Sequence, residues 1–114
     1  MGGELEYLVS GGAYLDPGLA RWWEALGFKI VQGYGTTEAS PVVACHTVAH
    51  RDPTSVGRPL PGVEVKIAED GEVLVRGENI TRGYWQNPRA TAEAFVDGWY
   101  KTGDLGGFDR SGSL

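Results

Sequence analysis

The chain has 114 residues, of which 41% are hydrophobic and 22% charged, and its formal net charge at pH 7 is −5. This length fits at most one ordinary domain or a piece of a longer protein, and the composition allows a buried core and argues against wholesale disorder. The acidic balance leaves no basic stripe for a phosphate backbone, so we expect no nucleic-acid partner.

The one cysteine, Cys45, cannot form an internal disulfide. A single thiol is typical of proteins in a reducing cytoplasm, and we therefore expect a cytoplasmic protein. No apolar run approaches the roughly 20 residues that a membrane-spanning helix needs, so no transmembrane segment is predicted. Eighteen glycines and six prolines favour strands, turns and open loops over long helices.

A strand, a helix and a second strand are predicted in the first third of the chain. The apolar residues 6–9 predict a buried strand that ends in a glycine-rich turn. Asp16 is placed to cap a helix with Pro17 at its first position, and Gly27 to end it. One apolar face of that helix carries Leu19, Trp22, Trp23 and Leu26. Residues 28–32 predict the second strand, which makes the unit a parallel crossover.

The loop after the second strand has the composition of a ligand site. Residues 33–38, Gly-Tyr-Gly-Thr-Thr-Glu, combine two glycines, two hydroxyls, an aromatic ring and a carboxylate. Such a set suits a magnesium-bound nucleotide phosphate, because glycines let the backbone approach a ligand and carboxylate oxygens bind hard cations. It is neither a dinucleotide turn, since Glu38 stands where the third glycine is needed, nor a Walker loop, which needs Gly-Lys-Ser/Thr. Both glycine-rich strand ends should form adjacent walls of one site.

The second half of the chain is predicted to be rich in β-structure. Residues 46–54 are polar and irregular, and residues 56–62 form a stiff connection, so we divide the chain into residues 1–50 and 51–114. Alternating apolar residues at 63–67 and 73–75 around a turn predict a hairpin. Asn87-Pro88 predicts the start of a short helix that Asp97-Gly98 ends, with three inward-facing residues, Ala92, Phe95 and Val96.

Residues 99–105 near the end of the chain predict a strand that runs into a tight turn. The pattern predicts the start of a further strand at Ser113-Leu114, so we expect the unit to be truncated. The two histidines, His46 and His50, lack a third ligand, so no metal site is predicted there. A nucleophilic pair of Cys45 and His46 is improbable because neighbouring residues of a strand point to opposite faces.

Four ordered blocks resemble the adenylate-forming, AMP-binding superfamily of acyl-CoA synthetases, luciferases and peptide-synthetase adenylation domains. They are Ser10-Gly11-Gly12-Ala13, Tyr34-Gly35-Thr36-Thr37-Glu38, the stretch from Gly71-Glu72-Val73-Leu74-Val75-Arg76-Gly77 to Gly83-Tyr84-Trp85, and Trp99-Tyr100-Lys101-Thr102-Gly103-Asp104. The stretch 37–43 followed by 55–62 is most similar to medium- and long-chain fatty acyl-CoA synthetases.

The resemblance implies an α+β fold, in which the end of an α/β subdomain is followed by a small β-rich, barrel-like subdomain. It also implies an acid-thiol ligase. A carboxylate, here a fatty acid, attacks the α-phosphate of ATP to give acyl-AMP, and coenzyme A then takes the acyl group. The family's phosphate loop, its hinge and its catalytic lysine are absent from this chain. We therefore expect no complete catalysis from these residues alone, and a peripheral membrane contact of the parent protein stays open.

Family roles are implied for the matching residues. Tyr34 would lie against adenine, Thr37 would bind the α-phosphate, Glu38 would bind Mg²⁺ and Asp104 would bind the ribose hydroxyls. Thr37 and Glu38 would thereby act in catalysis. The nucleotide would also touch residues of the two glycine-containing blocks, namely Gly11, Gly12, Ala13, Gly35 and Thr36.

Each of these residues also has a purely structural interpretation. Tyr34 could be a core aromatic, Glu38 a first-turn helix carboxylate and Asp104 a turn former. Two other functions stay open as well. One is an adenylation domain that loads a carrier protein or stops at acyl-AMP, and the other is a stand-alone nucleotide-binding module without catalysis.

Overall fold

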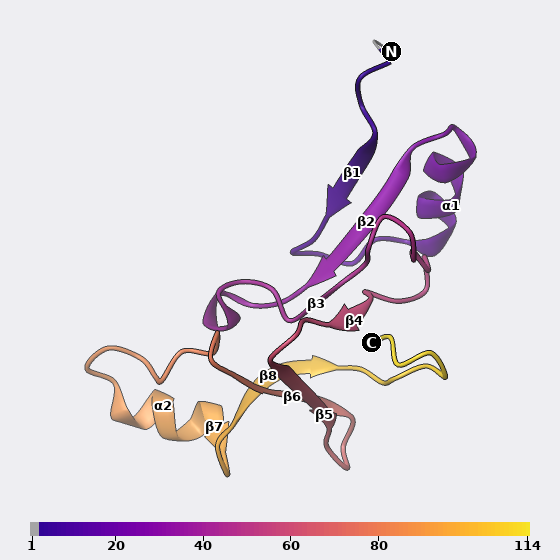
Figure 1. Cartoon of the computed structure of the whole chain (residues 1–114). Helices are drawn as coiled ribbons and strands as arrows, with labels where there is room; N and C mark the ends of the chain where they lie inside the picture. The colour runs from indigo at the N-terminus through magenta and orange to yellow at the C-terminus, as the bar shows by residue number, and fades with distance from the viewer. Residues whose placement is uncertain (1–2) are drawn as a thin grey trace.

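The computed structural model describes residues 3–114, whose strands form two four-stranded sheets (Figure 1). The first sheet has the order β1-β2-β3-β4. Its strands are β1 (Tyr7–Ser10), β2 (Lys29–Tyr34), β3 (Ala44–Cys45) and β4 (Arg58–Pro59), and helix α1 (Pro17–Ala25) lies between β1 and β2 in the chain. The mixed α+β class that the sequence predicts is confirmed.

The predicted strand-helix-strand crossover is present, with β1 and β2 parallel. The Asp16 side chain accepts a hydrogen bond of 2.9 Å from the backbone N–H of Leu19 and so caps α1, which begins at Pro17 as expected. Ala20 faces the sheet and is buried. The Asp16 cap and Pro17, which are neighbours in the sequence, therefore define where this helix begins.

Strand β1 is not the buried strand that its apolar sequence predicts. Val9 is 75% exposed, and Trp22 on α1 is 57% exposed. The reason is that β1 pairs only with β2, and α1 packs on β2 rather than on β1. A parallel strand is buried only where layers cover both of its faces, and the described residues provide no such layers over β1.

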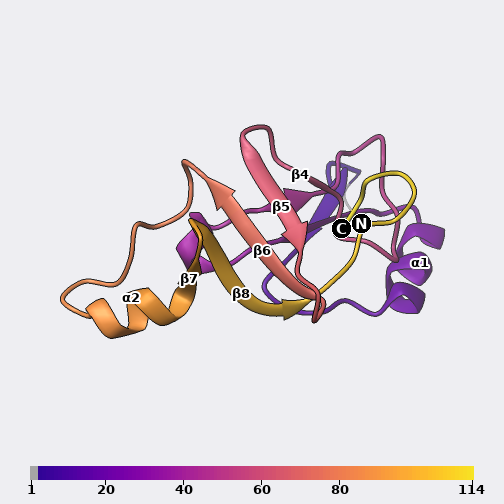
Figure 2. The same cartoon turned by 90° about the horizontal axis from the view of Figure 1, so that it is seen from below.

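The second sheet is antiparallel, with the order β5-β6-β8-β7 (Figure 2). Its strands are β5 (Val63–Ile67), β6 (Glu72–Gly77), β7 (Phe95–Val96) and β8 (Trp99–Leu105). The predicted hairpin is present as β5 and β6. The β-rich second part is present, and within the described residues its sheet stays open instead of closing into a barrel, because β5 and β7 are opposite edges that do not pair with each other. The division at residues 50 and 51 stays a prediction, although β4 of the first sheet lies beyond it.

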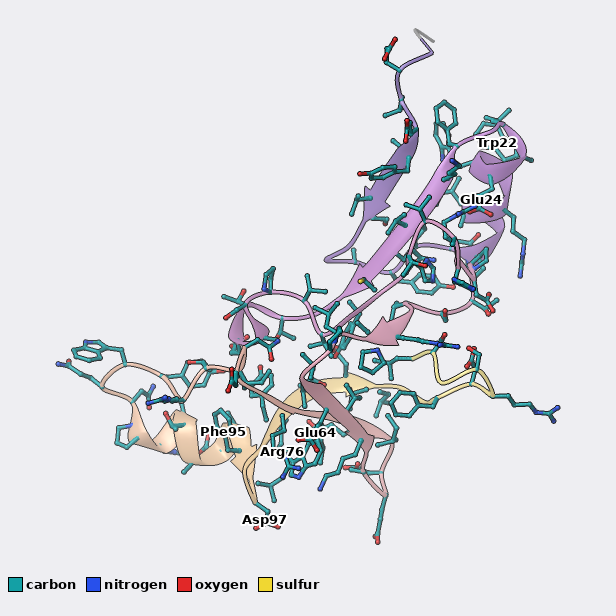
Figure 3. All side chains as sticks on the ribbon, viewed as in Figure 1. Trp22, Glu24, Glu64, Arg76, Phe95 and Asp97 are labelled. Carbon is teal, nitrogen blue, oxygen red and sulfur yellow. The ribbon has the colours of Figure 1, made fainter. Side chains whose placement is uncertain are left out.

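The segment after the second helix differs from its prediction. Helix α2 (Pro88–Ala94) is capped by Asn87, as expected, but it ends before Phe95. Phe95 and Val96 form β7, and Asp97 and Gly98 turn the chain into β8 with positive φ angles of 49° and 78°. Figure 3 places Asp97 at this tip. A two-residue Asp-Gly hairpin turn requires such angles, and it brings the Phe95 ring to 5.6 Å from that of Tyr100.

A small apolar core joins the two sheets. Ala39 and Val43 come from the segment between β2 and β3, Val73 and Val75 come from β6, and all four are almost fully buried. Tyr34, at the end of β2, packs against this cluster. The contact sets the end of the first sheet against the middle of the second. Within residues 3–114, neither helix has the length and apolar character needed to cross a bilayer.

We predict that Gly35→Ala destabilises the fold. A Cβ at this position would collide with the carbonyl group of Pro41, and overpacking of this kind costs about 1–3 kcal/mol. Urea unfolding followed by tryptophan fluorescence would measure the loss of unfolding free energy. Gly107→Ala is the matched control, because a Cβ there meets no atom within 4 Å. Equal stability of the two variants would contradict the prediction.

Candidate nucleotide-binding site

A cleft of about 390 Å³ lies where three separate parts of the chain meet. Ser10 and Ala13 come from the carboxyl end of β1, Gly33 and Tyr34 from the carboxyl end of β2, and Asp104 from β8. The two strand ends that the sequence predicts to be adjacent walls therefore do line one cleft. Gly11 and Gly12 lie between Ser10 and Ala13 in the turn that forms the wall.

Asp104 reaches the cleft through an irregularity in β8 instead of the tight turn that the sequence predicts. Leu105 lies opposite Glu72, yet Lys101 lies opposite Leu74, so β8 holds extra residues between these pairs. Gly103 has a φ of 77°, which an L side chain rarely adopts. The strand thus continues to Leu105, and the bulge directs Asp104 toward the first sheet.

Hydrogen bonds hold this bulge in place. The Thr102 hydroxyl donates to the carbonyl of Val73 at 2.7 Å and accepts from the backbone N–H of Asp104 at 3.1 Å. The backbone N–H of Gly103 donates to the Glu72 carboxylate at 2.9 Å. The backbone at Asp104 is therefore fixed although its side chain is exposed.

Tyr34 and Asp104 contact each other directly. The Tyr34 hydroxyl donates to Oδ2 of Asp104 over 2.6 Å. Partial burial raises the pKa of the Tyr34 hydroxyl, and the hydrogen bond to Asp104 raises it further. Tyr34 therefore stays a neutral donor, and a half-buried aromatic ring lies beside a carboxylate at the edge of the cleft.

The short 3₁₀ helix η1 (Thr37–Ala39) follows β2 and carries the other predicted residues. Thr37 is exposed, Glu38 is partly exposed and Ala39 is fully buried in the core. With Ala39 buried, Thr37 and Glu38 are left at the surface, three and four positions after Tyr34 and outside the set of described residues that line the cleft. Thr36, which precedes η1, has a buried hydroxyl with no hydrogen-bond partner among the described residues.

Glu38 has a partner that sequence reasoning did not identify. The hydroxyl of Tyr84 donates to Oε1 of Glu38 at 2.7 Å. This hydrogen bond lowers the pKa of the Glu38 carboxyl and raises the pKa of Tyr84 to about 12. The Gly-Tyr-Trp block that contains Tyr84 is visible in the sequence. Nothing local to that block, however, indicates that its ring reaches a residue 46 positions away.

The glycines of the site have different physical roles. A Cβ at Gly11 would lie 3.1 Å from the carbonyl oxygen of Gly33, so Gly11 allows the two walls to approach. Gly12 has a φ of 79° and faces open space. Gly35 packs against the Pro41 backbone. The expectation that Gly35 serves ligand approach thus has a structural alternative.

Glu38 lies four positions after Tyr34, and its Oε1 accepts from Tyr84, so its other oxygen can bind a metal ion. No cluster of three or more His, Cys, Asp or Glu residues suited to a metal exists within residues 3–114. His46 is buried, accepts from the Gln32 backbone N–H at 3.2 Å, and lies 3.3 Å from the Ser55 hydroxyl. Both its ring nitrogens therefore have protein partners. A single carboxylate fits Mg²⁺, which is usually held by one or two carboxylates together with substrate phosphates and water.

Comparison with known proteins places these features in a family. The AMP-binding enzyme family matches residues 1–85. The long-chain-fatty-acid–CoA ligase FadD15 of Mycobacterium tuberculosis is 46% identical over 114 residues, which is 100% of this chain and 19% of that protein. The chain thus spans about a fifth of the length of this relative.

Solved structures give the same result. The O-succinylbenzoate coenzyme A synthetase MenE of Bacillus subtilis, in complex with ATP and magnesium ion, has a TM-score of 0.81 and 30% identity over 95% of this chain and 25% of its own. A mutant of the amide bond synthetase Mcba from Marinactinospora thermotolerans has a TM-score of 0.83 and 41% identity, covering 96% and 25%. The predicted resemblance is confirmed, and the chain belongs to the AMP-binding enzyme family.

Proposed function

We propose that this chain is the adenosine-binding part of an AMP-forming acyl-CoA synthetase. In the complete enzyme a carboxylate oxygen attacks the α-phosphorus of ATP, which gives acyl-AMP and releases pyrophosphate. The thiol of coenzyme A then attacks the acyl carbon and releases AMP. The observation that supports this function best is the cleft in which residues from β1, β2 and β8 meet.

The proposed roles follow from the geometry of that cleft. Tyr34 offers its half-buried ring to adenine, and Asp104 offers two carboxylate oxygens to the ribose hydroxyls. Ala13 lines the cleft from the turn after β1, and we assign backbone contacts with the nucleotide to Ala13 and to Gly11 and Gly12 of the same turn. One oxygen of Asp104 holds the Tyr34 hydroxyl, so the ribose would share or displace this hydrogen bond.

The phosphate end is assigned to the exposed side of η1 and the residues that precede it, Gly35 and Thr36. Thr37 presents its hydroxyl to the α-phosphate, and Glu38 supplies one carboxylate to Mg²⁺. When bound, the ion would offset the negative charge that builds on the α-phosphate as the carboxylate attacks the phosphorus. Thr37 and Glu38 are therefore the proposed catalytic residues.

The carboxylic acid substrate and the acceptor of the acyl group are proposed from the relatives. FadD15 matches the whole chain and is named for long-chain fatty acids, which supports a fatty acid and coenzyme A as substrates. The similarity to Mcba, an amide bond synthetase, favours a second candidate, in which the activated acyl group goes to an acceptor other than coenzyme A.

The single cysteine supports a cytoplasmic location. Since the chain matches only 19% of FadD15, we assign complete catalysis to a longer parent protein.

The first test is the binding of AMP to this chain. We expect AMP to shift backbone amide NMR signals at residues 11–13, 34–37 and 104. Asp104→Asn should weaken AMP binding about 10- to 100-fold, because a hydrogen bond to a charged group contributes about 1.5–3 kcal/mol. Asp97→Asn makes the same chemical change at the distant β7–β8 tip and should leave binding unchanged (Figure 3). Dispersed spectra that do not respond to millimolar AMP would contradict binding by this chain.

A second test concerns the metal. Mg²⁺ should strengthen ATP binding to the unchanged chain, and removal of Mg²⁺ with EDTA should abolish this gain. Glu38→Gln should lose most of the gain, because an amide oxygen is a weaker ligand for Mg²⁺ than a carboxylate. Calorimetric titration with and without Mg²⁺ measures the difference. Glu64→Gln is the control, since Glu64 pairs with Arg76 on the second sheet (Figure 3). If Mg²⁺ strengthened ATP binding equally in Glu38→Gln and Glu64→Gln, the assignment of Glu38 as the Mg²⁺ ligand would be refuted.

A further inference from the structure

The loop between β6 and α2 contacts η1 at three points, and we call its residues 79–84 the brace loop. The Asn79 side-chain amide donates to the carbonyl oxygen of Ala39 at 2.8 Å. The backbone N–H of Thr81 donates to the carbonyl oxygen of Glu38 at 2.7 Å. The Tyr84 hydroxyl donates to the Glu38 carboxylate, also at 2.7 Å. Backbone and side chain of one residue, Glu38, are thus both held by the same loop.

The η1 segment needs such support. It contains only three residues, and Ser40, which ends it, has a φ of 54° and a ψ of 55°. A residue other than glycine adopts this left-handed conformation only where its surroundings determine it. The core residue Ala39 anchors one side of the segment, and the brace loop contacts it from the second sheet.

The brace loop is itself fixed to α2. The backbone N–H of Tyr84 donates to the Thr91 hydroxyl at 2.9 Å, and that hydroxyl donates to the carbonyl oxygen of Asn87 at 2.9 Å. Gly83 has a φ of 146°, and a Cβ there would lie 2.6 Å from a methyl carbon of Thr91. The close packing at Gly83 and the backbone hydrogen bond at Tyr84 fix the backbone from which the Tyr84 hydroxyl reaches Glu38.

We propose that Tyr84 is a positioning residue for the phosphate end of the site. It holds one carboxylate oxygen of Glu38 so that the other is presented to the divalent cation of a bound nucleotide. This inference rests on the proposed function, because it presumes that Glu38 serves a nucleotide-bound cation. Tyr84 itself touches neither the nucleotide nor the cation, and it acts through the orientation of Glu38. Partners that orient a metal ligand typically contribute about 10- to 100-fold to metal affinity.

The test measures ATP binding with and without Mg²⁺ in the chain that carries Tyr84→Phe, which removes only the hydroxyl. We expect binding of metal-free AMP to be unchanged, and the gain in ATP affinity from Mg²⁺ to fall about tenfold. Mn²⁺ bound with ATP should broaden the amide signals of Thr37 and Glu38 less than in the unchanged chain. Tyr7→Phe is the matched control, since it removes a hydroxyl from an exposed tyrosine on β1, the edge strand of the first sheet.

A double variant separates this inference from a general effect on folding. In the Glu38→Gln background, adding Tyr84→Phe should cause no further loss of the Mg²⁺ effect, because the two residues act through one carboxylate. A full Mg²⁺ effect in Tyr84→Phe, together with normal AMP binding, would overturn the inference and leave the proposed function standing. Failure of the unchanged chain to bind AMP would overturn the proposed function, and the inference with it.

Discussion

The contact between the segment that links β2 to β3 and strand β6 is the interaction on which the rest of the structure depends. Ala39 and Val43 pack against Val73 and Val75, and these four residues are almost completely buried although the chain is small. Burial of apolar area at this junction supplies the non-directional attraction that holds the two sheets together. If this contact were lost, the sheets would share few other packing residues, and the cleft between them would have no fixed shape.

The same contact determines the electrostatics of the site. It brings each of two tyrosine hydroxyls to a carboxylate across the junction, Tyr34 to Asp104 and Tyr84 to Glu38. Tyr34 and Glu38 come from β2 and from η1, which follows it. Their partners, Asp104 and Tyr84, come from β8 and from the loop between β6 and α2. The hydrogen bonds add direction to a junction that apolar packing alone would leave adjustable. Both carboxylates keep a second oxygen for another partner, as a nucleotide site requires.

Local chemistry in the sequence predicted much of the fold correctly. The Asp16-Pro17 start of α1, the parallel crossover and the β5–β6 hairpin follow from capping, hydrophobic spacing and turn residues close together in the chain. The prediction failed where two local signals competed. Residues 92–96 have helical spacing, but the Asp97-Gly98 turn formed a hairpin, and Phe95 gained a contact with Tyr100 that a helix would not provide. Tertiary pairing decided between these alternatives.

The sequence by itself determined the family, since its four blocks occur in order along the chain, and it also indicated which residues offer hydroxyls, carboxylates and an aromatic ring. Only the tertiary structure decided which of these groups meet. Tyr34 and Asp104 are 70 positions apart, and Tyr84 and Glu38 are 46 apart, so no local pattern relates them. The bulge at Gly103 and the burial of Ala39 direct these side chains toward one another. The bulge depends on the pairing of β6 with β8, and the burial of Ala39 depends on packing between the two sheets. A linear pattern of residues contains neither.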